Sequence, residues 1–420
     1  MNRREFLKQS ATVSAGAAGL AAAAPTTMTL TAAGQRRPGA NEIVNVGLIG
    51  CGGMGSTHRH KLVAMSKKGE PVRVAAVCDV WEKRLNEAVK DSGAKPYKDY
   101  RRLLEDKDID AVLIAVPDHW HAPMTIDAAD AGKDVYCEKP MTYWKYLTDA
   151  QDVVAAIERN NRVMQVGTNG LSDSIWWQAA DRVQKGELGN LIHAQASDMR
   201  NGYIDVYDPT RNDPDAKPGV NLDWEMWLGP ANPVPWNPGR FFAFRVFWDY
   251  SGGITTDFFP HLLTPLICTM GLTFPSCVTS SGGKYNPKNV GEVPDIINVT
   301  IEYPNGPSIL LVGSVTNDTA LPTLIRGTKA TLTFDGPGAI IEPQAAAKKE
   351  IKREEIKRER QGSVEEHWRD FLGCIKSRKK PRSNEIVGYH VMTALHMAVS
   401  AYYDGHSRQW DPDVQEVLVL

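Results

Sequence analysis

Residues 44–55 read Val-Asn-Val-Gly-Leu-Ile-Gly-Cys-Gly-Gly-Met-Gly, a short apolar run that ends in a cluster of glycines. The run predicts a buried strand, and residues 56–68 predict a helix because they carry no strong helix breaker. Glycines between a strand and a helix let backbone N–H groups approach a dinucleotide pyrophosphate at the positive end of the helix. The spacing therefore predicts a dinucleotide-binding turn. Its residues are Gly50, Gly52, Gly53, Met54 and Gly55.

Strands and helices continue to alternate after this turn. Apolar runs at residues 72–78, 111–116, 134–137 and 163–166 predict four more strands, with helical sequence between most of them. Such alternation is typical of a parallel sheet with right-handed crossovers. We therefore predict an α/β dinucleotide-binding domain over residues 42–166.

The second predicted strand ends in an acidic residue, Asp79. A carboxylate at this position can accept hydrogen bonds from the adenosine ribose hydroxyls, and its charge repels a 2'-phosphate. NAD is therefore favoured over NADP as the cofactor. Capping of the following helix is the alternative role for Asp79. Arg84 lies a few residues further on and softens the preference for NAD if it reaches the ribose.

The third predicted strand ends in a histidine-containing loop, Pro117-Asp118-His119-Trp120-His121. The loop lies at the carboxyl edge of the predicted sheet, where open α/β folds bind their ligands. We therefore assign Pro117, His119 and His121 to the cofactor site. His119 and His121 could line the nicotinamide or transfer protons, and capping of the next helix is the alternative role for His121.

From about residue 167 the strands no longer alternate regularly with helices. Isolated strands are predicted at residues 191–198 and 296–303, and an amphipathic helix is predicted at residues 386–403. We predict a second, α+β domain over residues 167–420 with a largely antiparallel sheet. Residues 201–240 are rich in Pro, Gly, Asp, Asn and Trp, which predicts an ordered excursion packed by its aromatic side chains.

The N-terminus has the pattern of an export signal. Arg3 and Arg4 precede an Ala- and Gly-rich run from Ala11 to Ala24, and the pattern resembles a twin-arginine signal peptide. We assign residues 1–34 to a signal peptide and linker and expect a periplasmic or extracytoplasmic location. The apolar run is too short and too rich in alanine to serve as a permanent membrane anchor.

The overall charge and the cysteines argue against several kinds of partner. The chain has 48 Lys and Arg against 50 Asp and Glu, a formal net charge of -2, so no basic field favours nucleic acid. Its 6 cysteines lack zinc-ligand spacing, and no other ligand cluster stands out. We therefore expect neither a nucleic-acid partner nor a metal site.

Glu138-Lys139-Pro140 follows the fourth predicted strand. This triplet resembles a motif of the Gfo/Idh/MocA family. The glycine turn, Asp79, the histidine loop and the later Asp257-x-x-x-His261 extend the resemblance over nearly the whole chain beyond residue 34. That family includes glucose-fructose oxidoreductase and inositol dehydrogenase. The resemblance implies a Rossmann domain followed by a large open, mostly antiparallel sheet, often assembled into dimers or tetramers. It also places Glu138 and Lys139 at the cofactor and implies a cis Lys139–Pro140 bond.

The resemblance further implies three catalytic residues. His261 would be the acid/base for the substrate hydroxyl, Lys139 its polarising partner, and Asp257 their support. The residues alone agree in part, because a spacing of four puts Asp257 and His261 on one face of a helix. The charge of a lysine at a strand end can also polarise a substrate hydroxyl. Pro260 lies between Asp257 and His261 and would bend the start of the helix.

Four residues are candidates for contact with a sugar. Polar side chains match sugar hydroxyls, and aromatic faces match the C–H faces of the ring. Residues 167–171 read Gly-Thr-Asn-Gly-Leu, where many relatives carry an Arg-Phe pair, so this part of the pocket departs from the family pattern. The candidates are Asn169, Arg200, Trp248 and Tyr250.

The leading hypothesis is an NAD(P)-dependent oxidoreductase that oxidises a secondary hydroxyl of a sugar, polyol or sugar derivative. An NAD-dependent glycoside hydrolase is the second hypothesis, in which transient oxidation, elimination and re-reduction recycle the NAD. A non-catalytic NAD-binding regulatory protein is the third. The presence of Lys139, Asp257 and His261 together counts against the third hypothesis.

Overall fold

The computed structural model describes residues 42–201, 207–287 and 289–420. The predicted export signal at residues 1–34 lies outside these residues. Among the described helices, none is both long enough and apolar enough to span a bilayer.

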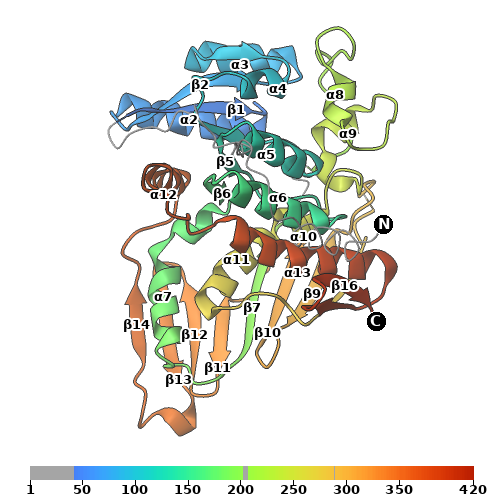
Figure 1. The fold of residues 1–420 in the computed structure, drawn as a ribbon. Coiled ribbons are helices and arrows are strands. Elements are labelled where there is room, and N and C mark those ends of the chain that lie inside the picture. Colours follow the sequence, from blue (N-terminus) through green and yellow to red (C-terminus); the bar gives the residue numbers. More distant parts are fainter. Residues whose placement is uncertain (1–41, 202–206, 288) are drawn as a thin grey trace, which may run out of the picture. The chain divides into compact units, whose positions relative to one another are not determined.

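The first half of the chain folds around a parallel sheet of six strands in the order β3-β2-β1-β4-β5-β6 (Figure 1). This confirms the predicted α/β fold. The side chains of β1 are buried along its whole length, as expected for a parallel strand covered on both faces. The strands are β1 (Val44–Ile49), β2 (Val72–Cys78), β3 (Lys95–Tyr97), β4 (Ala111–Ile114), β5 (Asp134–Cys137) and β6 (Met164–Val166).

Helices cover both faces of this sheet. Leu62 of α2 and Ala88 of α3 share one buried cluster with Trp368 of α12, whereas Leu103 of α4 and Ala128 of α5 belong to the cluster on the other face. The C-terminal part of the chain therefore completes the first domain. The helices are α2 (Gly53–Lys67), α3 (Glu82–Ser92), α4 (Tyr100–Leu104), α5 (His121–Asp130), α6 (Thr148–Arg159) and α12 (Val364–Ser377).

The second half contains a sheet of ten strands in the order β14-β13-β12-β11-β7-β10-β9-β8-β15-β16. Its strands are antiparallel except for the pair β7 and β10, which confirms the predicted, largely antiparallel sheet. The strands are β7 (Leu191–Met199), β8 (Cys277–Gly283), β9 (Ile296–Glu302), β10 (Ser308–Ser314), β11 (Leu324–Gly327), β12 (Ala330–Asp335), β13 (Gly338–Pro343), β14 (Glu354–Lys357), β15 (Arg408–Asp411) and β16 (Glu416–Val419).

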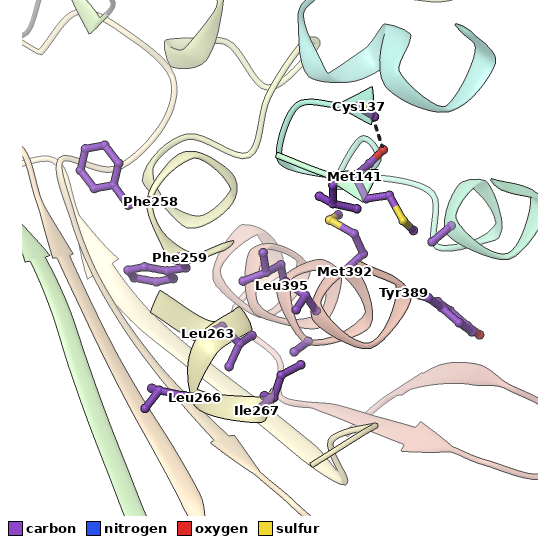
Figure 2. Packing of buried hydrophobic residues seen from close by; sticks show 14 of the residues in the cluster. Cys137, Met141, Phe258, Phe259, Leu263, Leu266, Ile267, Tyr389, Met392 and Leu395 are labelled. Atoms are coloured by element: carbon purple, nitrogen blue, oxygen red, sulfur yellow. Dashed lines mark hydrogen bonds between the residues drawn. The ribbon is translucent and has the colours of Figure 1, made fainter. Parts of the chain in front are cut away.

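One face of this sheet is covered by α7 (Ser174–Gln184), α11 (Phe259–Met270) and α13 (Glu385–Asp404) (Figure 1). Figure 2 shows side chains of α11 and α13 packed together and Met141 reaching into the same cluster. A Cβ at Gly388 would lie 2.4 Å from Met141 Sδ, so the glycine lets α13 approach this segment closely. The core therefore anchors the chain two residues after Lys139.

The ordered excursion was predicted at residues 201–240; we call residues 207–250, which overlap it and extend to Tyr250, the aromatic excursion. It contains the short helices α8 (Trp224–Leu228) and α9 (Pro238–Phe242), and α10 (Ile254–Asp257) follows it. Its aromatic rings pack with Trp81 of the first domain in one buried cluster. Stacked and edge-to-face rings account for the order of a segment so rich in proline and glycine. The prediction of aromatic packing is confirmed.

Candidate active site

The glycine turn leaves room for a phosphate group at the start of α2. Gly50 has φ +89°, and a Cβ there would lie 2.3 Å from the Ala115 carbonyl oxygen. A Cβ at Gly55 would lie 1.8 Å from the Gly50 oxygen, whereas a Cβ at Gly53 would meet nothing within 4 Å. No side chain caps the helix start at Gly52. The turn therefore fits a dinucleotide pyrophosphate held by backbone N–H groups.

Asp79 links the glycine turn to the loop after β2. Its carboxylate accepts hydrogen bonds from the backbone N–H groups of Cys51 at 2.7 Å and Trp81 at 2.8 Å. Burial raises the pKa of Asp79, although the charge of Arg84 and these two hydrogen bonds oppose the rise. The alternative role of Asp79 as a helix cap is wrong, because Trp81 is the N-cap residue of α3.

Arg84 reaches the glycine turn. Its guanidinium lies 3.1 Å from the position of a Cβ on Gly52, and it stacks 4.9 Å from the Phe241 ring and 5.2 Å from the Trp81 ring. Aromatic rings from both domains therefore fix this cation beside the predicted cofactor site.

The aromatic excursion contacts both loops that flank this site. In the loop after β2, the Val80 carbonyl accepts from the Asp223 N–H at 3.0 Å, and at the start of α3 the Glu82 N–H donates to the Asn221 carbonyl at 2.9 Å. In the loop after β4, Trp120 Nε1 donates to the Trp227 carbonyl at 2.8 Å.

Lys139 meets a carboxylate from the second domain. The Lys139–Pro140 bond is cis, as the family resemblance implied. Lys139 Nζ forms an ion pair with the Asp257 carboxylate and donates to the Asp257 carbonyl at 2.7 Å. Arg245 Nε lies 3.1 Å from the same carboxylate, and the Tyr207 hydroxyl donates to its other oxygen at 2.8 Å. Burial favours the neutral carboxyl group, but Arg245 and Lys139 hold the pKa of Asp257 far below its ordinary value.

His261 lies beside this ion pair with a neutral imidazole. Burial and the charge of Lys139 lower the pKa of His261 to about 4. The imidazole has no hydrogen-bond partner among the residues that the structure describes. The prediction of one helical face for Asp257 and His261 is wrong, because α10 ends at Asp257 and α11 begins at Phe259. Pro260 lies in the first turn of α11, as the predicted bend requires.

A buried network holds Glu138 next to Lys139. His58 Nε2 contacts the Glu138 carboxylate at 2.7 Å, and Trp368 Nε1 donates to His58 Nδ1 at 2.8 Å. An indole N–H can only donate, so His58 is protonated on Nε2 and donates to Glu138. Burial favours the neutral form, yet the His58 hydrogen bond and nearby charges leave the pKa of Glu138 below its ordinary value. Glu138 is therefore a buried anion beside the Lys139 loop.

Both histidines of the loop after β4 are buried. His119 Nε2 lies 3.3 Å from the Trp227 carbonyl oxygen, and burial lowers the pKa of His119 to about 4. His121 packs its two ring nitrogens against the carbonyl groups of Val116 and Pro140. These contacts leave no free ring nitrogen on His121 for proton transfer. Pro117 starts the short 3-10 turn (Asp118–Trp120) that carries His119.

The four sugar-contact candidates lie in different surroundings. Tyr250 is fully buried, and its hydroxyl accepts from Arg240 at 3.1 Å, which favours packing over substrate contact. Trp248 is half-buried against Trp144, with ring centroids 5.6 Å apart. Arg200 forms an ion pair with Asp198 at 2.8 Å and stacks 4.0 Å from the Phe258 ring, close enough to Asp257 for their charges to interact. Asn169 opens a short 3-10 turn after β6.

Two family profiles match the chain in the order of its two sheets. The profile of an oxidoreductase family with an NAD-binding Rossmann fold matches residues 44–168. The profile of the C-terminal alpha/beta domain of an oxidoreductase family matches residues 206–419. The chain therefore belongs to the Gfo/Idh/MocA oxidoreductase family, and its first domain is an NAD-binding Rossmann domain.

Curated relatives match parts of the chain. Inositol 2-dehydrogenase of Salmonella typhimurium is 33% identical over 157 residues, which are 36% of this chain and 45% of that protein. Glycosyl hydrolase family 109 protein 2 of Shewanella sp. strain ANA-3 is 35% identical over 217 residues, which are 47% of this chain and 45% of that protein. The chain thus spans less than half the length of these relatives.

A solved structure shares the fold over most of the chain. It is the WlbA dehydrogenase from Bordetella pertussis in complex with NADH and UDP-GlcNAcA, with a TM-score of 0.66 and 17% sequence identity. The match covers 88% of this chain and 99% of that one. Identity this low shows the fold alone.

Proposed function

We propose that the protein is an NAD-dependent oxidoreductase that acts on a secondary hydroxyl group of a sugar, polyol or sugar derivative. One observation carries the proposal: Lys139, Asp257 and His261 meet at the carboxyl end of the Rossmann sheet. Oxidation of an alcohol needs a group that takes the hydroxyl proton and a cation that stabilises the developing negative charge on oxygen. His261 and Lys139 have these two properties.

Each residue of the site has a separate role in this reaction. When bound, NAD accepts the hydride from the C–H bond of the alcohol carbon, which becomes a ketone. His261 takes the hydroxyl proton, because its imidazole is neutral above about pH 4. Lys139 Nζ donates to the substrate oxygen. Asp257 holds Lys139 in place and accepts no proton itself, since its pKa lies far below the ordinary value.

This function is tested by supplying the purified protein with NAD and a panel of sugars, polyols and sugar nucleotides and measuring the NADH formed. We expect turnover of at least one compound and its loss in Lys139→Met. A protein that binds NAD but neither oxidises these compounds nor cleaves glycosides would contradict the proposal and favour a regulatory role.

NAD-dependent glycoside hydrolysis is a second candidate function. In this cycle the transient ketone allows the glycosidic group to be eliminated, and re-reduction leaves no net NADH. The similarity to a protein named as a glycosyl hydrolase of family 109 supports this candidate. So do the contacts of the aromatic excursion with both loops at the cofactor site, since a recycled cofactor has no need to exchange. Cleavage of an aryl glycoside without net NADH would separate this function from net oxidation.

The aromatic excursion is expected to slow the release of NAD. Trp227 stacks on Trp224 at 4.7 Å and packs against His119 at 5.6 Å, so Trp227→Ala should loosen the excursion from the loop after β4. We expect NAD to dissociate at least about tenfold faster, equal to about 1.4 kcal/mol. Retention of bound NAD over time after gel filtration measures this rate. Trp176→Ala, which disrupts packing on Phe334, is the matched control, and equal rates in the two variants would contradict the prediction.

We also propose export by the twin-arginine route and assembly into a dimer or tetramer. Arg3, Arg4 and the apolar run to Ala24 support export. Half-buried residues on the face of β9 and β10 opposite the helices support assembly. Cell fractionation with an Arg3→Lys/Arg4→Lys variant tests export, and light scattering tests assembly. A cytoplasmic wild type or a monomer would contradict the corresponding proposal.

A further inference from the structure

The side chain of His121 is wedged between two backbone carbonyl groups. Nδ1 lies 2.5 Å from the Pro140 oxygen and Nε2 lies 2.9 Å from the Val116 oxygen, and the residue is only 1% exposed. A carbonyl oxygen accepts hydrogen bonds and cannot donate them, whereas neutral imidazole carries a single N–H. The two contacts are both hydrogen bonds only when both ring nitrogens carry a hydrogen.

We propose that His121 is a buried imidazolium that positions Lys139 by tying the end of β4 to the Lys139–Pro140 turn. Val116 follows β4 and precedes the loop at the cofactor site, and Pro140 follows Lys139 directly. One cation therefore fixes the spacing between these two segments. The role assigned to Lys139 rests on the proposed function, but the charge of His121 rests on the two carbonyl contacts alone.

Nearby groups stabilise this charge. The Cys137 thiol from β5 and the Asp118 carboxyl group from the 3-10 turn face the ring, and His119 is the neighbouring titratable group on the same loop. Asp118 also interacts with Arg245 and accepts from Thr256 Oγ1 at 3.2 Å.

These interactions determine the pH range over which His121 stays protonated. Burial by itself lowers the pKa of His121, but Cys137, Asp118 and the Pro140 carbonyl together raise it to about 9. The pKa of an unfolded histidine is about 6.5, so the stabilisation is complete below that pH and is lost as the pH rises through about 9. Lys139 should lose its fixed position over the same range.

The charge is tested directly by NMR of histidine labelled with ¹⁵N at about pH 7.5, above the ordinary histidine pKa. We expect one solvent-protected histidine with hydrogens on both ring nitrogens. Its signal should be absent from His121→Gln and present in His406→Gln, because His406 is exposed and far from this ring. Spectra in which every protected histidine is a neutral tautomer would overturn the proposal, and this result needs no variant to fold.

The positioning role is tested by activity against pH. In wild type, kcat should fall as the pH rises through about 9. His121→Gln keeps N–H donors but cannot titrate, so we expect about tenfold lower kcat, little change in KM and no such alkaline loss. The exposed His406→Gln is the control. An unchanged alkaline loss in His121→Gln would overturn the positioning role. A wild type without any activity would instead contradict the proposed function and leave the NMR result standing.

Discussion

His261→Asn is expected to lower kcat by about 10²- to 10⁴-fold while NAD still binds, because general acid-base catalysis contributes about this factor. The hydroxyl proton then has no acceptor, since the Asp257 carboxylate is held as an anion by Lys139, Arg245 and Tyr207. NAD affinity should stay close to the wild-type value, because His261 lies outside the glycine turn. Steady-state kinetics and NAD titration measure the two quantities separately.

The dependence of kcat/KM on pH tests the role of His261 as the base. The pKa of His261 is about 4 because of burial and the charge of Lys139, so wild-type kcat/KM should remain high at about pH 6 and fall as the pH drops through about 4. His261→Asn should lack this acid limb, and His406→Asn should keep it. A full wild-type rate in His261→Asn would rule out His261 as the base.

Local patterns were enough to predict most strands of the parallel sheet. The strand β1 is a continuous apolar run followed by glycines that the turn needs, and its parallel partners carry the same signal. Most strands of the second sheet were not predicted, and two further features of the chain lacked a local signal. The strand β3 has only three residues, one of them a proline, and its side chains are not buried. The helix break at Phe258 coincides with Pro260, which has no N–H to donate to the Thr256 carbonyl, so a new helix begins at Phe259.

The candidate site was predicted only in part. Lys139, Asp257 and His261 were identified through family motifs, and the structure brings them together. Arg245 and Tyr207, which complete the environment of Asp257, lie in segments without a motif.

The network behind Glu138 was also missed, for a similar reason. Trp368 is 310 residues away from His58 in the sequence, so nothing local links them. The charged groups around Lys139 are therefore held by residues that lie far apart in the sequence and that only the folded chain brings together.

Those charges make Asp257 the residue on which the stability of the site depends. Its carboxylate faces two cations in a nearly closed environment, since the Lys139 and Asp257 side chains are only 10% and 12% exposed. Asp257→Ala leaves Lys139 and Arg245 close together without the carboxylate that forms an ion pair with both. We expect the free energy of unfolding to fall by about 3–5 kcal/mol, which is the cost of removing one partner of a buried ion pair. Urea unfolding at neutral pH measures the loss.

Two comparisons make this prediction specific. Asp249→Ala removes the carboxylate from a more exposed pair with Arg240, which keeps a second partner in Glu292, and should cost no more than about 1 kcal/mol. Adding Arg245→Met to Asp257→Ala should recover part of the stability, because only one buried cation then lacks a partner. A loss below about 1 kcal/mol in Asp257→Ala would contradict the buried charge cluster.

The free energy of unfolding, measured as the pH is lowered, tests the same charge cluster independently. The pKa of Asp257 is lower in the folded protein than the unfolded value of about 3.9. The stabilisation that the Asp257 charge contributes is therefore complete above that pH. It is lost as the pH falls further, because the unfolded state takes up a proton before the folded state does. The difference in stability between wild type and Asp257→Ala should be constant near neutral pH and shrink below about pH 4. A difference that stays constant through the acid range would mean that the loss comes from packing and not from the charge of Asp257.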